Sequence, residues 1–372
     1  MYLHKRWVDM KKQTITPFQL NALLCLFLLG STVVLGLGLE VEEDAWIVTL
    51  LSSSIGILIL LFYIYLIAKH ELNLAELLIK GFGKYIGKFF VFLYIFYFLY
   101  IASRVVKDFT YFIAQILFYQ VEFWLISITF ICIVAYGSSL GIEALARTSE
   151  ILLFLVILML LTIIAFSILS DPFDLSNLLP FFSNNWGAIF QSMFPERITF
   201  PYGELIAFTL IFPLINDKKA LVKKTWIAIP IVTFLILVLT EITIAMLGAK
   251  VAAIYTFPLV KAIEQIDIWE FIQHLEILSV FTFFFVGFIK VSIFFKAALY
   301  SAHSLVKFDR TKLILLFASI LFLMAVFNSS SLPQHFYIGL KVIPEYIHLP
   351  FQFGIPILLF FVLHIRLKLG KN

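Results

Sequence analysis

Charged residues are scarce in this sequence, at 13% of its 372 residues, whereas 62% are hydrophobic and the mean hydropathy is +1.04. A soluble domain has too little core to bury so much apolar surface, so the composition indicates that lipid is the solvent. The apolar runs last about 20 residues, the length of a membrane-crossing helix, and they lack the short alternation of barrel strands. The sequence therefore predicts an all-α membrane protein.

Cysteine and the motifs of soluble catalysis are also lacking. The two cysteines, Cys25 and Cys132, lie inside apolar runs, which favours packing over a disulfide or a metal site. Phosphate-binding loops, hydrolase elbows and metalloprotease motifs are absent, and the seven histidines are scattered. We expect no enzyme, cofactor or metal, and we interpret His303 and His335 as residues of the membrane interface.

We expect one transmembrane domain over residues 1–372, with no connection long enough for a soluble domain. A polar, basic segment precedes the first span, and Thr16 with Pro17 is a typical helix start. Without a convincing cleavage site, this first span is expected to be retained. The ten predicted spans cover residues 17–38, 45–68, 85–117, 121–137, 149–170, 188–213, 225–248, 271–302, 312–327 and 342–366.

Basic residues are distributed unevenly between the two sets of loops. The loops opposite the N-terminal side hold Lys250, Lys261 and Lys341 together with an acidic cluster at 40–44. This is the positive-inside pattern, which places both termini in the cytoplasm. The net charge of +4 then reflects topology and does not indicate nucleic acid as a partner. The basic residues on the predicted cytoplasmic side are Lys5, Arg6, Lys11, Lys12, Lys69, Lys80, Lys84, Lys88, Arg147, Lys218, Lys219, Lys223, Lys224, Lys307, Arg310, Lys312, Arg366, Lys368 and Lys371.

The first and sixth spans are interrupted at corresponding positions. Residues 30–32 read Gly-Ser-Thr, and residues 200–204 read Phe-Pro-Tyr-Gly-Glu. Proline removes a helical donor and glycine weakens a helix, so both spans should unwind inside the membrane. Because unwound backbone at that depth must face protein or a wet cavity, paired breaks indicate a solute site between two inverted repeats, about 16–170 and 187–366. The alternative is a pair of simple kinks, since glycine and proline are common in membrane helices.

Ionisable residues within the spans are functional candidates because burying them in lipid is expensive. We predict that Lys290 in span eight pairs with Glu204 at the second break, either as part of the site or as a structural ion pair. Arg104 and Asp108 are spaced i, i+4 and can pair along span three. Lys107 and Lys296 can instead extend toward the membrane surface.

Several short motifs together resemble the spore germination permease family. They are residues 15–19 (Ile-Thr-Pro-Phe-Gln), 30–32, 44–46 (Asp-Ala-Trp), 83–88 (Gly-Lys-Tyr-Ile-Gly-Lys) and 200–205 (Phe-Pro-Tyr-Gly-Glu-Leu). The resemblance runs from about residue 15 to residue 368. These permeases are the B subunits of nutrient germinant receptors, members of the amino acid–polyamine–organocation superfamily. The resemblance implies the LeuT-type fold of ten helices, with two inverted five-helix repeats and broken helices one and six.

The resemblance also implies a function and a pocket. Such proteins lie in the spore inner membrane with an A subunit and a C lipoprotein, and sense amino acids or other nutrients. The family's proposed pocket corresponds here to Gly30, Ile101, Pro201, Ile293 and Ala297. The bulky, apolar Ile101 and Ile293 indicate either a hydrophobic amino acid or a nutrient that differs from alanine altogether. Combined with the breaks and with helical stripes on spans three and eight, the candidate ligand-binding residues are Gly30, Ser31, Thr32, Tyr97, Ile101, Pro201, Tyr202, Gly203, Glu204, Lys290, Ile293 and Ala297.

Three functional classes stay open. A sensor would shift between two states on binding its nutrient and act through its partners. A permease would move an amino acid by alternating access. A weaker possibility is a structural or channel-forming subunit. In either of the first two, Lys290 is predicted to act as a tethered cation where ion-coupled relatives hold sodium.

Overall fold

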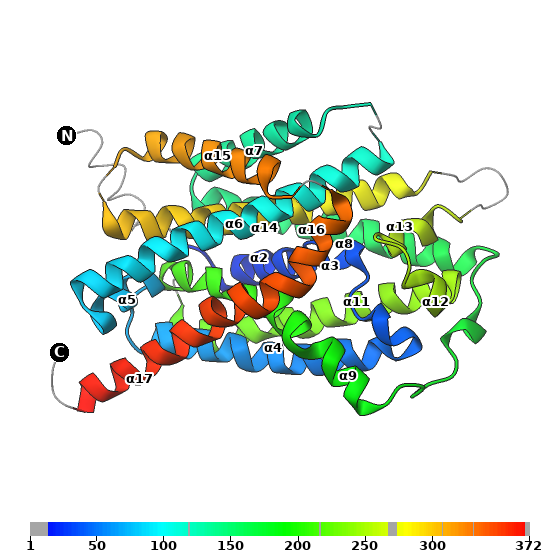
Figure 1. The fold of residues 1–372 in the computed structure, drawn as a ribbon, viewed down its shortest axis with the longest axis horizontal. Helices are drawn as coiled ribbons and strands as arrows, with labels where there is room; N and C mark the ends of the chain where they lie inside the picture. The colour runs from blue at the N-terminus through cyan, green and yellow to red at the C-terminus, as the bar shows by residue number, and fades with distance from the viewer. Residues whose placement is uncertain are drawn as a thin grey trace.

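Long apolar helices run side by side along the length of the molecule (Figure 1). The computed structural model describes residues 14–117, 120–215, 217–266, 274–306, 308–329 and 331–368. Within this part of the chain, seven helices are long and apolar enough to cross a membrane, which confirms a helical, multi-pass membrane protein. Two shorter apolar helices, Pro17–Leu29 and Phe123–Ser139, accompany them.

Most helix bounds lie within a few residues of the predicted spans. The start predicted for span eight, residue 271, lies outside the described residues. An additional short helix, α5, precedes the third span. The helices are α2 (Pro17–Leu29), α3 (Thr32–Leu35), η1 (Leu39–Asp44), α4 (Ala45–Ala68), α5 (Leu74–Phe82), α6 (Lys84–Ile116), α7 (Phe123–Ser139), α8 (Ile142–Leu169), η2 (Leu175–Leu178), α9 (Trp186–Ser192), η3 (Met193–Tyr202), η4 (Gly203–Leu210), η5 (Phe212–Leu214), α10 (Lys218–Lys224), η6 (Thr225–Ile227), α11 (Ala228–Leu247), α12 (Ala249–Ala252), α13 (Pro258–Ile263), α14 (Glu276–Leu305), α15 (Arg310–Phe327), α16 (Leu332–Tyr337), η7 (Ile338–Val342), η8 (Pro344–Gly354) and α17 (Ile355–Lys368).

Local sequence signals explain where the first helix begins and ends. The Thr16 hydroxyl accepts from the Gln19 amide and the Gln19 side chain accepts from the Thr16 amide, which forms a capping box. Pro17 occupies the first helical position. The helix ends at Gly30, whose φ of +21° is a conformation that side chains rarely adopt, and a short helix restarts at Thr32.

The segment from 193 to 210 also departs from a regular α-helix. η3 is π-helical, with non-helical backbone angles at Phe194 and Phe200, and η4 is a 3-10 helix. Pro201 lacks an amide hydrogen, so the ladder of backbone hydrogen bonds cannot continue through it. The backbone is therefore irregular near Gly30 and around Phe200 and Pro201.

The last span differs from the single regular helix predicted over 342–366. After α15 the chain forms α16, the π-helical η7 and η8, and then α17. Pro344 and Pro350 interrupt the hydrogen-bond ladder, and π-type turns accommodate the extra residues. This irregular stretch brings His348 and Gln352 into the interior.

Both ends of the described chain lie at the end of the bundle that carries α5. Arg366 Nη1 donates to the Lys80 carbonyl at 2.9 Å, and the Ile15 amide donates to the Leu214 carbonyl at 3.2 Å. The opposite end carries η1, η2 and α12 (Figure 1). We refer to these as the α5 end and the α12 end.

Candidate functional site

The buried centre of the site is a contact between α14 and η4. Lys290 Nζ lies 2.7 Å from Glu204 Oε2, and both side chains are removed from solvent. The ammonium also lies 4.3 Å from the ring centroid of Phe200 and 5.3 Å from that of Phe27. Aromatic faces attract a desolvated cation, so the rings add to the stabilisation of Lys290. The predicted pairing of these two residues is confirmed.

Lys290 also contacts the end of the first helix. A Cβ atom added to Gly30 would lie 2.6 Å from Lys290 Cδ and 3.2 Å from its Nζ. The carboxyl end of a helix carries partial negative charge from its free carbonyls, which favours a cation there. Gly30 is therefore required both for its backbone conformation and for the room that it leaves to Lys290.

Polar groups of α4, α6 and η8 form hydrogen bonds in the interior. The Tyr97 hydroxyl lies 3.1 Å from His348 Nδ1, and the Tyr63 hydroxyl lies 3.2 Å from the Gly203 carbonyl and 2.8 Å from the Gln352 carbonyl. The Gln352 side chain is fully buried beside the Tyr97 hydroxyl. His348 and Gln352 were not predicted as interior residues. The signal for them in the sequence is that two polar residues lie four apart within an apolar span.

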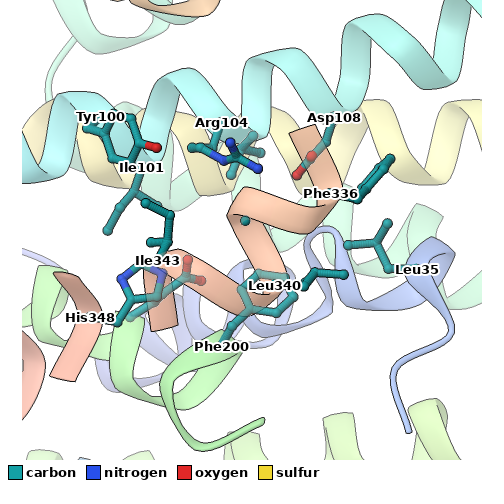
Figure 2. Close-up of a pocket in the computed structure, with 13 residues that line it drawn as sticks. Leu35, Tyr100, Ile101, Arg104, Asp108, Phe200, Phe336, Leu340, Ile343 and His348 are labelled. Carbon is teal, nitrogen blue, oxygen red and sulfur yellow. The ribbon is translucent and has the colours of Figure 1, made fainter. Parts of the chain in front are cut away.

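A small cavity lies on the α12 side of the Lys290–Glu204 pair. Figure 2 shows Arg104 and Asp108 projecting from α6 toward the segment that carries Phe336 and Leu340. Of the predicted ligand-binding residues, Ile101 and Glu204 line this cavity. Its lining consists of Leu35, Tyr100, Ile101, Arg104, Val105, Asp108, Phe200, Glu204, Phe336, Gly339, Leu340, Ile343 and His348.

The volume of this central cavity, about 40 Å³, limits what it can hold. One water molecule needs about 10–15 Å³ on this measure, so the cavity admits about three waters. An amino acid with a side chain requires a larger space. Binding such a ligand therefore needs a movement of the segments that form the wall.

The wall at the α12 end is α16, held by a network on α6. His335 Nε2 lies 2.7 Å from Asp108 Oδ1, Arg104 Nη2 donates to the His335 carbonyl, and Arg104 Nη1 donates to Asn328 Oδ1 at 3.3 Å. The Ser31 hydroxyl donates to Asp108 Oδ2 at 3.2 Å, which connects the network to the first helix break.

Two sequence predictions about this network are wrong. Arg104 and Asp108 form no ion pair with each other within the described residues, because each is engaged by the segment 328–335. His335 is not an interfacial residue: its side chain is fully buried and bonded to Asp108. Sequence spacing identifies neighbours on one helix, whereas these partners come from a distant part of the chain.

A second charged cluster lies on η3 toward the α12 end. Arg197 Nη2 donates to both carboxylate oxygens of Glu40 at 2.8 Å, and Lys341 Nζ lies 3.1 Å from Glu196 Oε2. These contacts tie η3 to η1 and to η7. Because η1 follows the first helix and η7 belongs to the last span, these ion pairs connect three segments that are distant in sequence.

The remaining predicted residues occupy the surrounding interior. Ile293 and Ala297 are fully buried on α14, and Tyr202 packs against Gly56 of α4, but none of these three lines the central cavity. The Thr32 hydroxyl donates to the Leu28 carbonyl at 2.8 Å. Lys296 does not extend to the surface; it is buried and donates to the Ser138 carbonyl at 3.2 Å.

The described residues contain no group of three or more His, Cys, Asp or Glu side chains placed to hold a metal ion. The polar groups gathered here are a cation, carboxylates, hydroxyls and an imidazole within an apolar bundle.

The helical fold is similar to the folds of two solved membrane transporters. The chain is similar to a Na⁺-coupled sialic acid symporter in a substrate-bound, outward-open state, with a TM-score of 0.66 and 13% identity over 94% of this chain and 79% of that one. It is also similar to Mhp1, a nucleobase-cation-symport-1 family transporter in a closed conformation with bromovinylhydantoin bound. That TM-score is 0.58, with 14% identity over 88% of this chain and 75% of that one. At these identities the likeness establishes the fold alone.

Sequence comparison gives the family. Residues 14–332 match the family model described as Spore germination protein. Spore germination protein KB of Bacillus subtilis (strain 168) is 30% identical over 357 residues, which cover 95% of each chain. The chain belongs to the spore germination protein family, as the resemblance of its motifs indicates.

Proposed function

We propose that the chain is the B subunit of a spore germinant receptor, which binds an amino acid near the Lys290–Glu204 pair and triggers germination with A and C subunits. The proposal includes ten spans in a single transmembrane domain of two inverted repeats, with broken helices one and six. It also places the protein in the spore inner membrane with both termini in the cytoplasm. Family membership carries the germination role, and the solute-binding fold supports a site within the bundle.

The lining of the central cavity favours a hydrophobic amino acid. Aliphatic and aromatic side chains such as Leu35, Ile101 and Ile343 form much of its surface, which suits an apolar side chain. Glu204 is an acceptor for an ammonium group, and Arg104 is a donor for a carboxylate once the wall moves. Both groups are already partnered in the closed arrangement, so ligand binding exchanges internal contacts for contacts with the ligand.

The alternative function is that of an amino acid permease, which the similarity to two symporters supports. The purified chain in liposomes, supplied with labelled amino acids, separates the two functions. Steady accumulation inside the vesicles establishes a permease. Saturable binding without accumulation supports a receptor.

Lys290 is proposed to supply the positive charge that a coupling ion supplies in ion-coupled symporters. Its ammonium lies against the end of the first helix and pairs with Glu204, so the site already contains a fixed cation. We expect ligand binding by the native protein to be independent of sodium. A sodium requirement in equilibrium binding measurements would contradict this role.

The germinant site is tested by crowding it at Gly30. In spores that carry Gly30→Leu, we expect the nutrient concentration for half-maximal germination to rise at least tenfold, because the new side chain overlaps Lys290. Gly83→Leu is the matched control: Gly83 also has a positive φ, +85°, but nothing lies within 4 Å of an added Cβ. Immunoblots of spore membranes establish equal amounts of protein. Normal nutrient sensitivity of Gly30→Leu spores at equal protein would eliminate the site.

A further inference from the structure

A second, larger cavity lies between α6, α7 and α15 near the α12 end. Its volume is about 510 Å³, and it shares no lining residue with the central cavity. Lys107, Tyr111 and Glu122 are among its lining residues, together with residues of the linker between α15 and α16. The function proposed above does not use this cavity.

The ammonium of Lys107 is the unusual feature of its wall. The side chain is largely buried, and Nζ donates to two neutral acceptors, the Val326 carbonyl at 3.2 Å and the Ser329 carbonyl at 2.5 Å. No carboxylate forms an ion pair with Lys107 within the described residues. A buried charge compensated by carbonyl dipoles alone is costly in a membrane protein, and an anionic group in the cavity would offset that cost.

Neither Lys107 nor the neighbouring Arg104 has a carboxylate partner within the described residues. Arg104, one turn away on α6, also donates to neutral oxygens of residues 328 and 335. Asp108 is the carboxylate bonded within this network. Asp108 is engaged by His335 and Ser31 on the other side of α6, so the cavity side of Lys107 is open to an anionic group.

The mouth of the cavity is apolar and aromatic. Phe123 and Trp124 at the start of α7 line the cavity and are about half exposed. Aromatic residues at the ends of membrane helices typically lie at the level of the lipid headgroups. Deeper in the cavity, the Thr110 and Ser127 hydroxyls lie 2.8 Å apart and supply further polar groups. An occupant with a charged head and apolar chains matches this arrangement.

Glu122 adds a negative charge to the same cavity. It is exposed at the position preceding α7 and lines the cavity without pairing to Lys107. One cation and one carboxylate on a shared wall complement a headgroup that carries both signs. We propose that this cavity binds a phospholipid whose headgroup contains a phosphate and a primary ammonium, with the phosphate on Lys107 and the ammonium near Glu122.

The lipid site and the central cavity lie on opposite sides of one wall. Lys107 and Asp108 are consecutive residues that line different cavities. The centroid of the Tyr111 ring lies 5.8 Å from the Lys107 ammonium and 5.7 Å from the centroid of the His335 ring. A lipid phosphate therefore shares Lys107 with the carbonyls that precede α16, the segment that closes the central cavity.

The test measures the thermal stability of the delipidated full-length protein in detergent as short-chain lipids are added. Phosphatidylethanolamine should raise the Tm of the native protein at lower concentration than phosphatidylglycerol, because Glu122 disfavours a purely anionic headgroup. Lys107→Gln should raise the phosphatidylethanolamine concentration for the half-maximal shift about tenfold, because a charge-assisted contact is lost. Glu122→Gln should remove the preference between the two lipids.

Lys250→Gln is the matched control, because Lys250 is an exposed lysine on α12 at the same end of the bundle. An unchanged lipid response of Lys107→Gln would overturn the proposal. If Lys107→Gln does not fold, Glu122→Gln decides, and a retained lipid preference in that variant rejects the site. Stabilisation by soluble phosphoethanolamine or by a free amino acid at the same concentration as the lipid would assign the cavity to a solute instead.

Discussion

Lys290 Nζ and Glu204 Oε2 lie 2.7 Å apart inside the helix bundle, where neither side chain reaches solvent. The contact joins α14 to the irregular segment that follows Pro201, and Gly30 at the end of α2 packs against the same lysine. One ion pair thus connects both irregular segments to a long continuous helix.

Removal of one partner of this pair should be strongly destabilising. Lys290→Met leaves Glu204 buried without a counter-charge, and the expected loss of unfolding free energy is about 3–5 kcal/mol. The double variant Lys290→Met with Glu204→Leu removes both charges and should regain most of that loss. Thermal unfolding of the native protein, Lys290→Met, Glu204→Leu and the double variant in one detergent measures this double-mutant cycle. Additive losses in the double variant would show that the two side chains do not depend on each other.

Asp108→Asn should open the central cavity by weakening the attachment of α16. The charge-assisted bond between Asp108 and His335 becomes a neutral one, a change of about 1–1.5 kcal/mol, or about tenfold in the open population. A cysteine at Ile343, which lines the cavity, reports opening by its rate of thiol labelling after Cys25 and Cys132 are replaced with Ala.

Asp174→Asn serves as the control for this labelling experiment, since Asp174 is an exposed carboxylate that accepts a local bond from the Ser176 amide at 2.8 Å. We expect its labelling rate to equal that of the parent. Equal rates in Asp108→Asn and the parent would mean that the Asp108–His335 bond does not hold the wall.

The two cations that contact Glu196 should differ sharply in their effect on stability. The Arg197 side chain is 5% exposed and binds Glu40 as well, whereas the Lys341 side chain is 60% exposed. Arg197→Ala removes the contacts to Glu40, leaves the buried Glu196 with Lys341 alone, and should cost about 3 kcal/mol. Lys341→Ala removes a solvent-screened contact and should cost less than about 1 kcal/mol. Similar losses of unfolding free energy for both variants would contradict this difference in burial.

Asp44 should prove essential for anchoring the loop before α9. Its buried carboxylate accepts from the Phe182 amide at 2.7 Å and from the Asn184 amide at 2.8 Å. Asp44→Asn loses charge-assisted bonds and should destabilise the protein by about 2 kcal/mol. Limited proteolysis should then cut residues 180–186 faster. Glu43→Gln, one residue away, is the control and should leave the cleavage rate unchanged.

Some features followed from the sequence because they depend on local rules. Apolar length predicted the membrane class, Thr16 and Pro17 marked the first helix start, and Gly30 and Pro201 marked irregular backbone. The pairing of Lys290 with Glu204 was also predictable, because two opposite charges at similar depth in lipid must compensate each other.

Other features were decided by the tertiary structure alone. Arg104 and Asp108 have the spacing of a helical pair, yet both bind the segment at 328–335, more than 200 residues later in the chain. His348 and Gln352 lie in the interior of the last span, which contains prolines and is π-helical in part. A pattern of apolar residues does not predict which side of such an irregular helix faces the interior.

The sequence by itself thus determined that the chain lies in a lipid bilayer, that its spans are helices, and where glycine and proline make the backbone irregular. Each of these depends on hydropathy or on the geometry of a single residue. Only the tertiary structure decided which side chains enclose the central cavity and which cations lack a carboxylate. Those outcomes depend on contacts between helices that are distant in sequence, where packing chooses one partner among several of suitable charge.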